Sequence, residues 1–281
     1  MILNRGSMIE TEIIDVHLHA MYEQVPPIRL PEGIRTHSTY DDYKKTTFQM
    51  LKEHKIRAVT SGEYTAEWKK ENPDRIIRGL DHCVEGHPCS NLIKSQLEKE
   101  ELEVLGELAF SQYLGMLPNG PEVDSYLTLS EAYDKPICLH MGLSFRGTPF
   151  LFSDKYRAGF SNPLLLEDAL VRHPKLRIWL AHAGWPMLDE MVNMLWTYPQ
   201  LHVDVSAIDW MIPRTEFYSY LRRLVDAGLC DQVMYGSDQM MWPDTMLYSI
   251  QTIREARFLS SEQRQDILFN NAVRFLGLET E

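Results

Sequence analysis

The sequence is poor in cysteine and has no long apolar run. Four of its 281 residues are cysteines, without a C-x-x-C pair: Cys83, Cys89, Cys138 and Cys230. This excludes a disulfide framework for a chain of this length. No apolar stretch approaches the roughly 20 residues of a membrane-spanning helix, and the start lacks the apolar segment of a signal peptide. We therefore expect a soluble, cytoplasmic protein without a membrane partner.

Positive charge is also scarce. The chain has 28 basic and 40 acidic residues, which gives a net charge of -12. No run of Lys or Arg is suited to gripping a phosphate backbone. This charge pattern argues against nucleic acid as a partner. The partner that we expect is a small-molecule substrate. The oligomeric state stays open, a homo-oligomer included.

One short segment contains several metal-binding residue types. His82, Cys83, His87 and Cys89 lie within eight residues. The fixed ligand pairs of a structural zinc module are absent. We therefore expect no structural zinc there.

Short apolar runs alternate with longer amphipathic segments along the whole chain. No internal repeat, low-complexity tract or flexible linker interrupts them. Eight runs have the character of buried strands: 13–16, 56–60, 75–80, 102–108, 136–139, 176–181, 201–205 and 232–235.

The segments between the strands are long enough for crossover helices. Apolar stripes at helical spacing include Tyr43, Thr47, Met50 and Leu51, and later Phe217, Leu221, Leu224 and Val225. A last apolar stripe predicts a C-terminal helix, which contains Leu268, Ala272, Phe275 and Leu276. Ser260 and Gln263 could form a capping box at its start. If the fold is a barrel, we expect this helix to close it from outside. The alternation predicts an α/β fold, a (β/α)8 TIM barrel with an additional C-terminal helix. A doubly wound sheet is the alternative, but no glycine-rich phosphate loop follows the first strand.

Polar residues stand at the carboxyl ends of five predicted strands. In a parallel barrel these ends form one face, which carries the active site. Residues two apart on a strand share a side, so the two histidines at the end of the first strand project into one space. Imidazole nitrogen and carboxylate oxygen are the ligands of a catalytic Zn²⁺. The predicted ligands are His17, His19, Glu107, His140, His182 and Asp238.

Other histidines have simpler explanations. His54 and His173 fall near predicted helix ends, where the helix dipole favours a cationic imidazole. His37 and His202 are also expected to be structural. His202 lies near the amino-terminal end of the seventh strand, away from the expected active face. The role of Glu107 stays open: it could bind the metal, or it could be a buried carboxylate that pairs with a neighbouring arginine.

At these residues the sequence resembles the amidohydrolase superfamily, in particular its amidohydrolase-2 branch. The matching motifs, in the family's order and spread over most of the chain, are Asp-Val-His17-Leu-His19, Cys-Leu-His140-Met-Gly, Leu-Ala-His182-Ala-Gly-Trp-Pro and Tyr-Gly-Ser-Asp238. The resemblance implies a divalent metal at the barrel mouth, bound by His17, His19, His140 and Asp238.

The resemblance leaves the number of ions open. A glutamate after the fourth strand, as in TatD-like members, would let Glu107 and His182 bind a second ion. In the branch similar to aminocarboxymuconate semialdehyde decarboxylase, the strand-six histidine stands beside a single metal and acts on its water. The cofactor we expect is a divalent metal, Zn²⁺ first and Mn²⁺ second, with one or two ions per chain.

The predicted chemistry is hydrolysis by a metal-activated water. Asp238 would take the proton from this water, and His182 would stabilise the developing oxyanion or serve as a second ligand. The substrate would be an ester, lactone or amide of a small, carboxylate-bearing molecule. The candidate substrate-binding residues are Arg146, Arg157, Trp185, Trp210 and Trp242, and the loop 145–160 is the candidate lid.

Two other functions stay open. One is a metal-dependent, non-oxidative decarboxylase of an aromatic or unsaturated acid, and the other is a metal-binding protein without turnover. Because a second methionine stands at position 8, we expect residues 1–8 to be a remnant ahead of the native start or a disordered start. Residues 9–281 would then form a single metal-dependent hydrolase barrel domain.

Overall fold

The computed structural model describes residues 12–22, 30–80 and 90–279. Eight parallel strands in this part of the chain match the eight predicted apolar runs. They are β1 (Ile13–His19), β2 (Ile56–Ser61), β3 (Ile76–Arg78), β4 (Leu105–Leu108), β5 (Ile137–His140), β6 (Ile178–Ala181), β7 (Leu201–Asp204) and β8 (Val233–Met234).

The strands follow one another around the molecule in sequence order. They pair as β1-β2-β3 and as β4-β5-β6-β7-β8, all parallel. Backbone hydrogen bonds join these two groups at both edges. Glu103 N donates to Arg78 O (2.9 Å) beside β3 and β4, and Val16 N donates to Tyr235 O (3.0 Å) beside β8 and β1. The predicted α/β barrel is confirmed.

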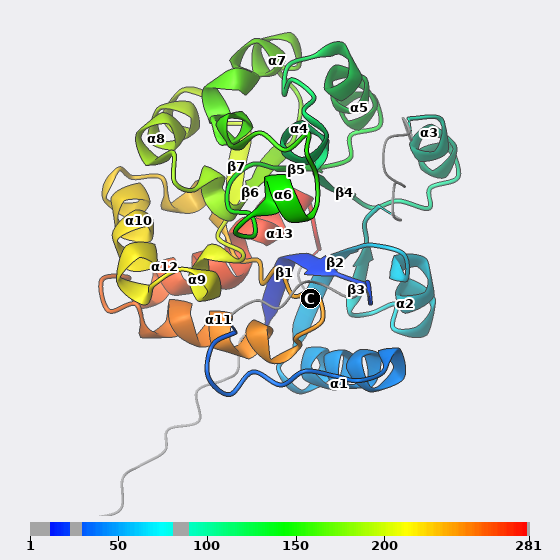
Figure 1. Ribbon diagram of the computed structural model, residues 1–281, viewed down its shortest axis with the longest axis vertical. Coiled ribbons are helices and arrows are strands. Elements are labelled where there is room, and N and C mark those ends of the chain that lie inside the picture. The colour runs from blue at the N-terminus through cyan, green and yellow to red at the C-terminus, as the bar shows by residue number, and fades with distance from the viewer. Residues whose placement is uncertain (1–11, 23–29, 81–89, 280–281) are drawn as a thin grey trace, which may run out of the picture.

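Helices surround the strands, as the view along the barrel shows (Figure 1). The longer ones have the buried stripes that the sequence predicts, such as Tyr43, Thr47, Met50 and Leu51 on α1. The α-helices are α1 (Tyr40–Glu53), α2 (Thr65–Glu71), α3 (Ser90–Glu98), α4 (Phe110–Leu114), α5 (Pro121–Ala132), α6 (Thr148–Leu151), α7 (Glu167–Arg172), α8 (Leu188–Thr197), α9 (Ile208–Met211), α10 (Arg214–Asp226), α11 (Asp244–Glu255), α12 (Ser261–Gln265) and α13 (Asn271–Leu276). Short 3-10 segments are η1 (Ala158–Ser161), η2 (Pro163–Leu166), η3 (His182–Gly184) and η4 (Cys230–Gln232), and η5 (Asp266–Asn270) is a π-helical turn.

Two apolar cores lie on the two sides of the strands. One packs the outward side chains of the strands against the surrounding helices, and includes Tyr43, Trp68 and Phe217. The other fills the barrel with alternate strand residues, among them Val16 and Trp179. Side chains therefore fill the barrel below its mouth, so the chemistry is confined to the strand ends.

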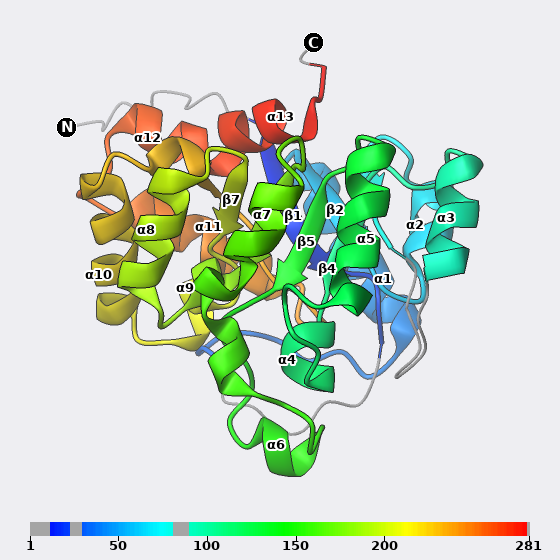
Figure 2. The same cartoon turned by 90° about the horizontal axis from the view of Figure 1, so that it is seen from above.

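The C-terminal helix closes one end of the barrel. The predicted capping box at Ser260 and Gln263 is present at the start of α12. Ala272 and Phe275 of α13 belong to the core inside the barrel. Figure 2 shows α13 at the end opposite to α4 and α6. The additional C-terminal helix is thus present, and it closes the barrel by covering the amino-terminal end of the strands.

Candidate metal centre at the barrel mouth

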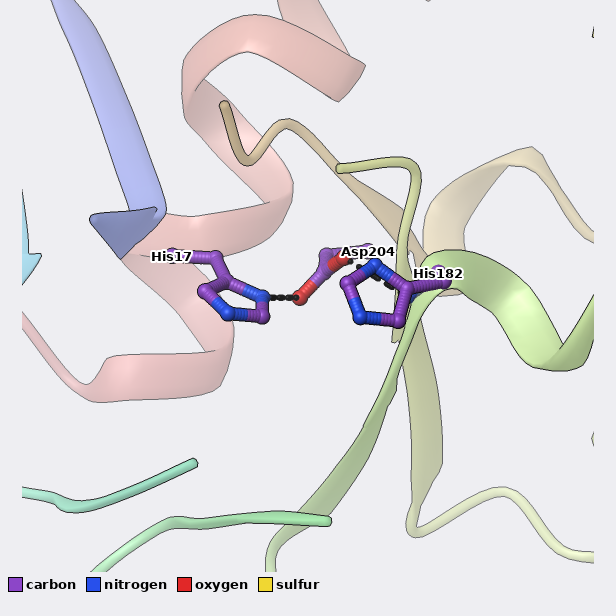
Figure 3. A group of neighbouring side chains, drawn as sticks. All are labelled: His17, His182 and Asp204. Carbon is purple, nitrogen blue, oxygen red and sulfur yellow. Dashed lines mark hydrogen bonds and ion pairs between the residues drawn. The ribbon is translucent and has the colours of Figure 1, made fainter. Parts of the chain in front are cut away.

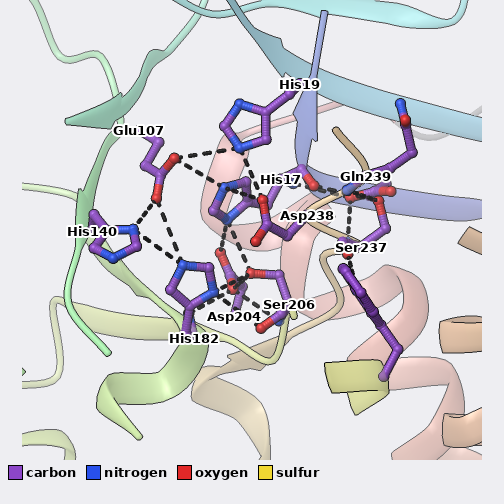
Figure 4. A network of polar contacts seen from close by, with 12 residues as sticks. His17, His19, Glu107, His140, His182, Asp204, Ser206, Ser237, Asp238 and Gln239 are labelled. Atoms are coloured by element: carbon purple, nitrogen blue, oxygen red, sulfur yellow. Dashed lines mark hydrogen bonds and ion pairs between the residues drawn. The ribbon is translucent and has the colours of Figure 1, made fainter. Parts of the chain in front are cut away.

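Six acidic and imidazole side chains meet at the carboxyl ends of five strands. The loops here continue directly from buried strands, so the strands fix the direction of these side chains. Figure 4 shows them pointing toward one another. They are the six predicted ligands: His17, His19, Glu107, His140, His182 and Asp238.

Four of these residues form a first group around β1. His19 Nε2 lies 2.9 Å from Asp238 Oδ1 and 3.4 Å from Glu107 Oε2. His17 Nε2 lies 3.3 Å from the same Glu107 oxygen and 3.7 Å from Asp238 Oδ1. Two imidazoles and two carboxylates therefore converge on one point.

The other two histidines lie on the far side of Glu107. His140 Nδ1 lies 2.5 Å from Glu107 Oε1, and His182 Nε2 lies 3.2 Å from His140 Nδ1. Glu107 thus contacts the first group through one oxygen and this pair through the other. His140, which the resemblance grouped with His17 and His19, is nearer to His182 in this structure.

Asp204 at the end of β7 was not among the predicted site residues, and it underlies the whole group. Its Oδ2 accepts hydrogen bonds from His17 Nδ1 (3.0 Å) and Trp179 Nε1 (3.1 Å). Its Oδ1 accepts from the backbone N–H groups of His182 and Ser206, both at 3.0 Å, and from the Ser206 hydroxyl. Figure 3 shows Asp204 between His17 and His182. Because these bonds engage both oxygens, Asp204 orients the histidines, and with His17 and His182 it also forms a group whose spacing could hold an ion.

The backbone at the strand ends adopts conformations that are costly for residues with side chains. His182 (φ 58°) and Asp238 (φ 49°) are both left-handed. Such positions are favoured by glycine and cluster at functional sites. At Gly236 a Cβ atom would lie 2.8 Å from His17 Cβ, so only glycine lets the chain after β8 pass this close to β1.

The charges of the buried groups are strongly coupled. Burial lowers the pKa of His17, but the carboxylates of Glu107 and Asp204 raise it well above its ordinary value. Burial raises the pKa of Glu107, whereas the charges on His17 and His140 hold it well below its ordinary value. The carboxylates are therefore ionised at neutral pH, and protons on His17 and His182, whose pKa values are raised, balance part of their charge. A bound cation would take the place of those protons.

The donor set fits a divalent ion. A tetrahedral ion with bonds of roughly 2.0–2.2 Å holds its ligands about 3.3–3.6 Å apart, close to the separations in the group of His17, His19, Glu107 and Asp238. His17 Nε2 is buried and faces Glu107 Oε2 at 3.3 Å and Asp238 Oδ1 at 3.7 Å, and neither contact has the geometry of a hydrogen bond. Because Nδ1 of this ring faces Asp204, Nε2 points into the group, and loss of its proton would direct a lone pair at an ion there.

A pocket of about 170 Å³ opens above this group. Its floor contains His19, Glu107, His140, His182 and Asp238. Its walls are mostly apolar, with two hydroxyl-bearing residues: Ala109, Tyr113, Leu143, Ser144, Phe145, Ala207, Met211 and Met240. A small organic molecule with an apolar body fits such a space.

The five predicted substrate-binding residues lie outside the lining of this pocket. Trp210 and Trp242 are buried behind it, in a cluster with Met240. Trp185 is half-buried, and its Nε1 donates to Glu216. Arg146 is exposed. Arg157 lines a separate hollow beside α4, and its guanidinium donates to the backbone carbonyls of Asp154 and Tyr156.

The candidate lid projects from the same end of the barrel. The segment 145–160 contains α6, which extends from the mouth in Figure 2. Phe150 is 90% exposed and Leu151 is 64% exposed. Phe145 at the base of the segment stacks on Phe152 and also lines the pocket.

Three histidines that were assigned no chemistry lie away from the candidate metal centre. His54 and His173 follow the last residues of α1 and α7, as expected, and His37 pairs with Asp42. The Cys/His segment 82–89 and the start of the chain lie outside the described residues. No described helix has both the length and the apolar character needed to span a bilayer.

Comparison with known proteins identifies relatives over nearly the whole chain. The sequence model of the Amidohydrolase family matches residues 14–278. Protein fluG of Emericella nidulans is 24% identical over 123 residues, which is 44% of this chain but only 13% of that protein.

Solved structures share the fold at low identity. An uncharacterised TIM-barrel protein from Bordetella bronchiseptica has a TM-score of 0.64 at 16% identity, covering 95% of this chain and 99% of that one. A probable 2-pyrone-4,6-dicarboxylic acid hydrolase from Acinetobacter baumannii, with citric acid bound, has 0.63 at 17%, covering 95% and 100%. The 2,6-dihydroxybenzoate decarboxylase from Rhizobium has 0.58 at 14%, covering 96% and 99%. These likenesses show a common barrel.

Proposed function

Because the chain belongs to the Amidohydrolase family, whose members are hydrolases or decarboxylases, we propose that it is a metal-dependent hydrolase of a small ester, lactone or amide. The observation that carries this proposal is the convergence of two imidazoles and two carboxylates on the floor of a small pocket. The similarity of the fold to a probable pyrone-dicarboxylate hydrolase supports it.

Six residues would hold the metal. His17, His19 and Asp238 face the first position together with one oxygen of Glu107. The other oxygen of Glu107, with His140 and His182, offers a second position. One Zn²⁺ at the first position is the simplest occupancy, and Mn²⁺ or a second ion would use the same donors.

The metal and the protein would divide the chemistry. When bound, a divalent ion supplies a Lewis acid for a carbonyl oxygen and activates water at neutral pH. Burial raises the pKa of Asp238, but the hydrogen bond from His19 and the charge on His17 lower it below the ordinary value. Asp238 is thus an ionised base that accepts a proton from the attacking water and passes it to the leaving group.

His182 is the proposed electrophilic partner. Burial lowers the pKa of this imidazole, whereas Glu107 and Asp238 raise it above its ordinary value. A protonated His182 at the pocket floor would donate a hydrogen bond to the oxygen that gains charge. Its backbone N–H is fixed by Asp204, which holds the ring in place.

Metal analysis combined with a substrate panel tests this function. Protein purified without chelator is assayed for Zn and Mn, and for hydrolysis of phenyl acetate, dihydrocoumarin and acetanilide. We expect at least one equivalent of metal and turnover of at least one compound without release of carbon dioxide.

Two matched variants connect turnover to the site. Asp238→Asn should lower kcat by about 10²- to 10⁴-fold, while Asp41→Asn, the same change on the exposed start of α1, should leave kcat unchanged. Full activity of metal-free protein, or of Asp238→Asn, would reject the proposal.

A decarboxylase is the second candidate, because the Rhizobium 2,6-dihydroxybenzoate decarboxylase shares the fold over 96% of this chain. The same residues would then bind an aromatic acid, and a protonated group would deliver a proton to carbon as carbon dioxide leaves. Release of carbon dioxide from hydroxybenzoates, with no turnover of the esters, lactone or amide, would select this reaction.

A further inference from the structure

A row of three hydroxyl groups leads away from the pocket. The Tyr113 hydroxyl lies 2.6 Å from Ser144 Oγ, and Ser144 Oγ lies 3.0 Å from Thr148 Oγ1. Thr148 Oγ1 donates to the backbone carbonyl of Phe145 at 2.6 Å. Tyr113 comes from α4 and Thr148 begins α6, two helices that are neighbours at the open end of the barrel (Figure 2). Tyr113 and Ser144 both line the pocket.

The carbonyl at the end of the row sets the direction of every hydrogen bond in it. A carbonyl oxygen only accepts, so the single proton of Thr148 is used there. Thr148 Oγ1 must then accept from Ser144, whose own proton is used in that bond. Ser144 Oγ must in turn accept from Tyr113. All three protons point away from the pocket, and the Tyr113 oxygen keeps a free lone pair.

The surroundings place this oxygen beside the metal-binding group. A tyrosine hydroxyl both donates and accepts, and here its single proton is used by Ser144. The ring stands edge-on to His140 with centroids 5.1 Å apart, which fixes the hydroxyl beside the metal-binding group. An acceptor in this position attracts an O–H or N–H group and repels a carboxylate.

We propose that Tyr113 determines specificity by accepting a hydrogen bond, and that the compounds taken by the pocket carry a hydroxyl or N–H group that donates to its oxygen. The proposal rests on the proposed function only in placing the reaction in the same pocket. It replaces the carboxylate expected from the sequence by a donor group at this position of the substrate.

Two probes of nearly equal shape test the proposal without turnover. Cyclohexanol has a hydroxyl donor, and cyclohexanone has an acceptor only. Their dissociation constants are measured by NMR titration of the protein as purified. We expect cyclohexanol to bind about tenfold more tightly, the effect of one hydrogen bond. Equal binding, or tighter binding of the ketone, would overturn the proposal.

Three variants examine the row itself. Tyr113→Phe removes the acceptor and should bring the ratio of the two constants to about one. Thr148→Val keeps the shape but removes the acceptor that Ser144 donates to, so Ser144 can donate to Tyr113 and the Tyr113 proton can turn into the pocket. Cyclohexanone should then gain affinity relative to the unmutated protein. Tyr198→Phe makes the same change outside the row and the pocket, at a tyrosine whose hydroxyl donates to Glu167, and should leave the ratio unchanged.

The outcomes separate this proposal from the proposed function. An unchanged ratio in Tyr113→Phe or in Thr148→Val would overturn it. If Tyr113→Phe does not fold, the unmutated protein and Thr148→Val decide. A tenfold ratio of the two dissociation constants, without hydrolysis of any panel compound, would reject only the hydrolase function. Hydrolysis of a panel compound with equal dissociation constants would reject only the role of Tyr113.

Discussion

Asp204 decides the direction in which His17 points. It holds His17 Nδ1 at 3.0 Å, and the rigid indole of Trp179 fixes the carboxylate from below. A carboxylate that holds the outer nitrogen of a ligating histidine typically changes metal affinity by 10- to 100-fold when it is lost.

We therefore expect Asp204→Asn to weaken Zn²⁺ binding by about 10- to 100-fold while the fold is kept. Competition with a chromophoric chelator measures the affinity, and circular dichroism measures the fold. Asp41→Asn on the exposed start of α1 is the control. An unchanged affinity in Asp204→Asn would show that His17 is held by packing alone.

Gly236 is the second residue on which the site depends. A methyl group there would meet His17 Cβ at 2.8 Å and Ser206 Cβ at 3.1 Å. Overpacking of this kind typically costs about 1–3 kcal/mol. Gly236→Ala should lower the free energy of unfolding by that amount and weaken metal binding together with it. Gly159→Ala, where nothing lies within 4 Å, is the matched control. Urea unfolding and chelator competition check both effects, and loss of stability with intact metal affinity would contradict the expectation.

The sequence was sufficient to find the six converging side chains, because polar residues at the ends of buried strands are rare and easily recognised. Asp204 could have been found by the same rule, since it ends β7. It was missed because His202 alone was weighed on that strand. Arg146 and Arg157 show the opposite limit: their charge is evident from the sequence, but the loop conformation decides where it points.

At the scale of elements, the strands were predictable and their surroundings were not. Period-two and continuous apolar runs locate the eight strands within a few residues. An apolar stripe shows that a helix is buried but not against which surface. For this reason the stripe of α13 predicted a helix that closes the barrel, but not that Phe275 would pack on the interior core at the amino-terminal end of the strands.

The contact between α13 and β7 should make stability depend on pH. His202 lies against Phe275 with ring centroids 4.5 Å apart. Burial lowers the pKa of His202 from 6.5 to about 4. Below pH 6.5 the His202 imidazole is protonated in the unfolded chain, but in the folded chain it stays neutral until the pH falls to about 4. Stability is therefore unaffected by this group above pH 6.5, falls as the pH drops from 6.5 to 4, and is level below that.

The size of the effect follows from the pKa difference. A shift of 2.5 pH units corresponds to roughly 3 kcal/mol. Urea unfolding at pH 7 and pH 4.5 is compared for the unmutated protein and His202→Leu. The variant should lose markedly less stability between the two conditions. Equal losses would show that other groups cause the whole dependence.

At the scale of the whole molecule, folding and chemistry occupy opposite ends of the barrel. The interior core and α13 stabilise the amino-terminal end of the strands. The six imidazole and carboxylate side chains of the candidate metal centre lie at the carboxyl end. Within the site, Asp238 and Glu107 each lie within hydrogen-bond distance of an imidazole, so removal of a metal leaves neither carboxylate without a polar partner. The fold should therefore not require the ion.

Metal removal tests this separation. An ion present at about 100 times its dissociation constant stabilises the folded state by about 2.7 kcal/mol, which for a chain of this size corresponds to a Tm change of roughly 5–10 °C. Treatment with a chelator should abolish turnover and lower Tm by this amount while the far-ultraviolet circular dichroism stays the same. Added Zn²⁺ should restore both activity and Tm. The cores are complete without the site, so loss of the helical circular dichroism signal on chelation would mean that the ion holds the barrel together. A Tm that does not change when metal is added would mean that no ion binds among these six residues.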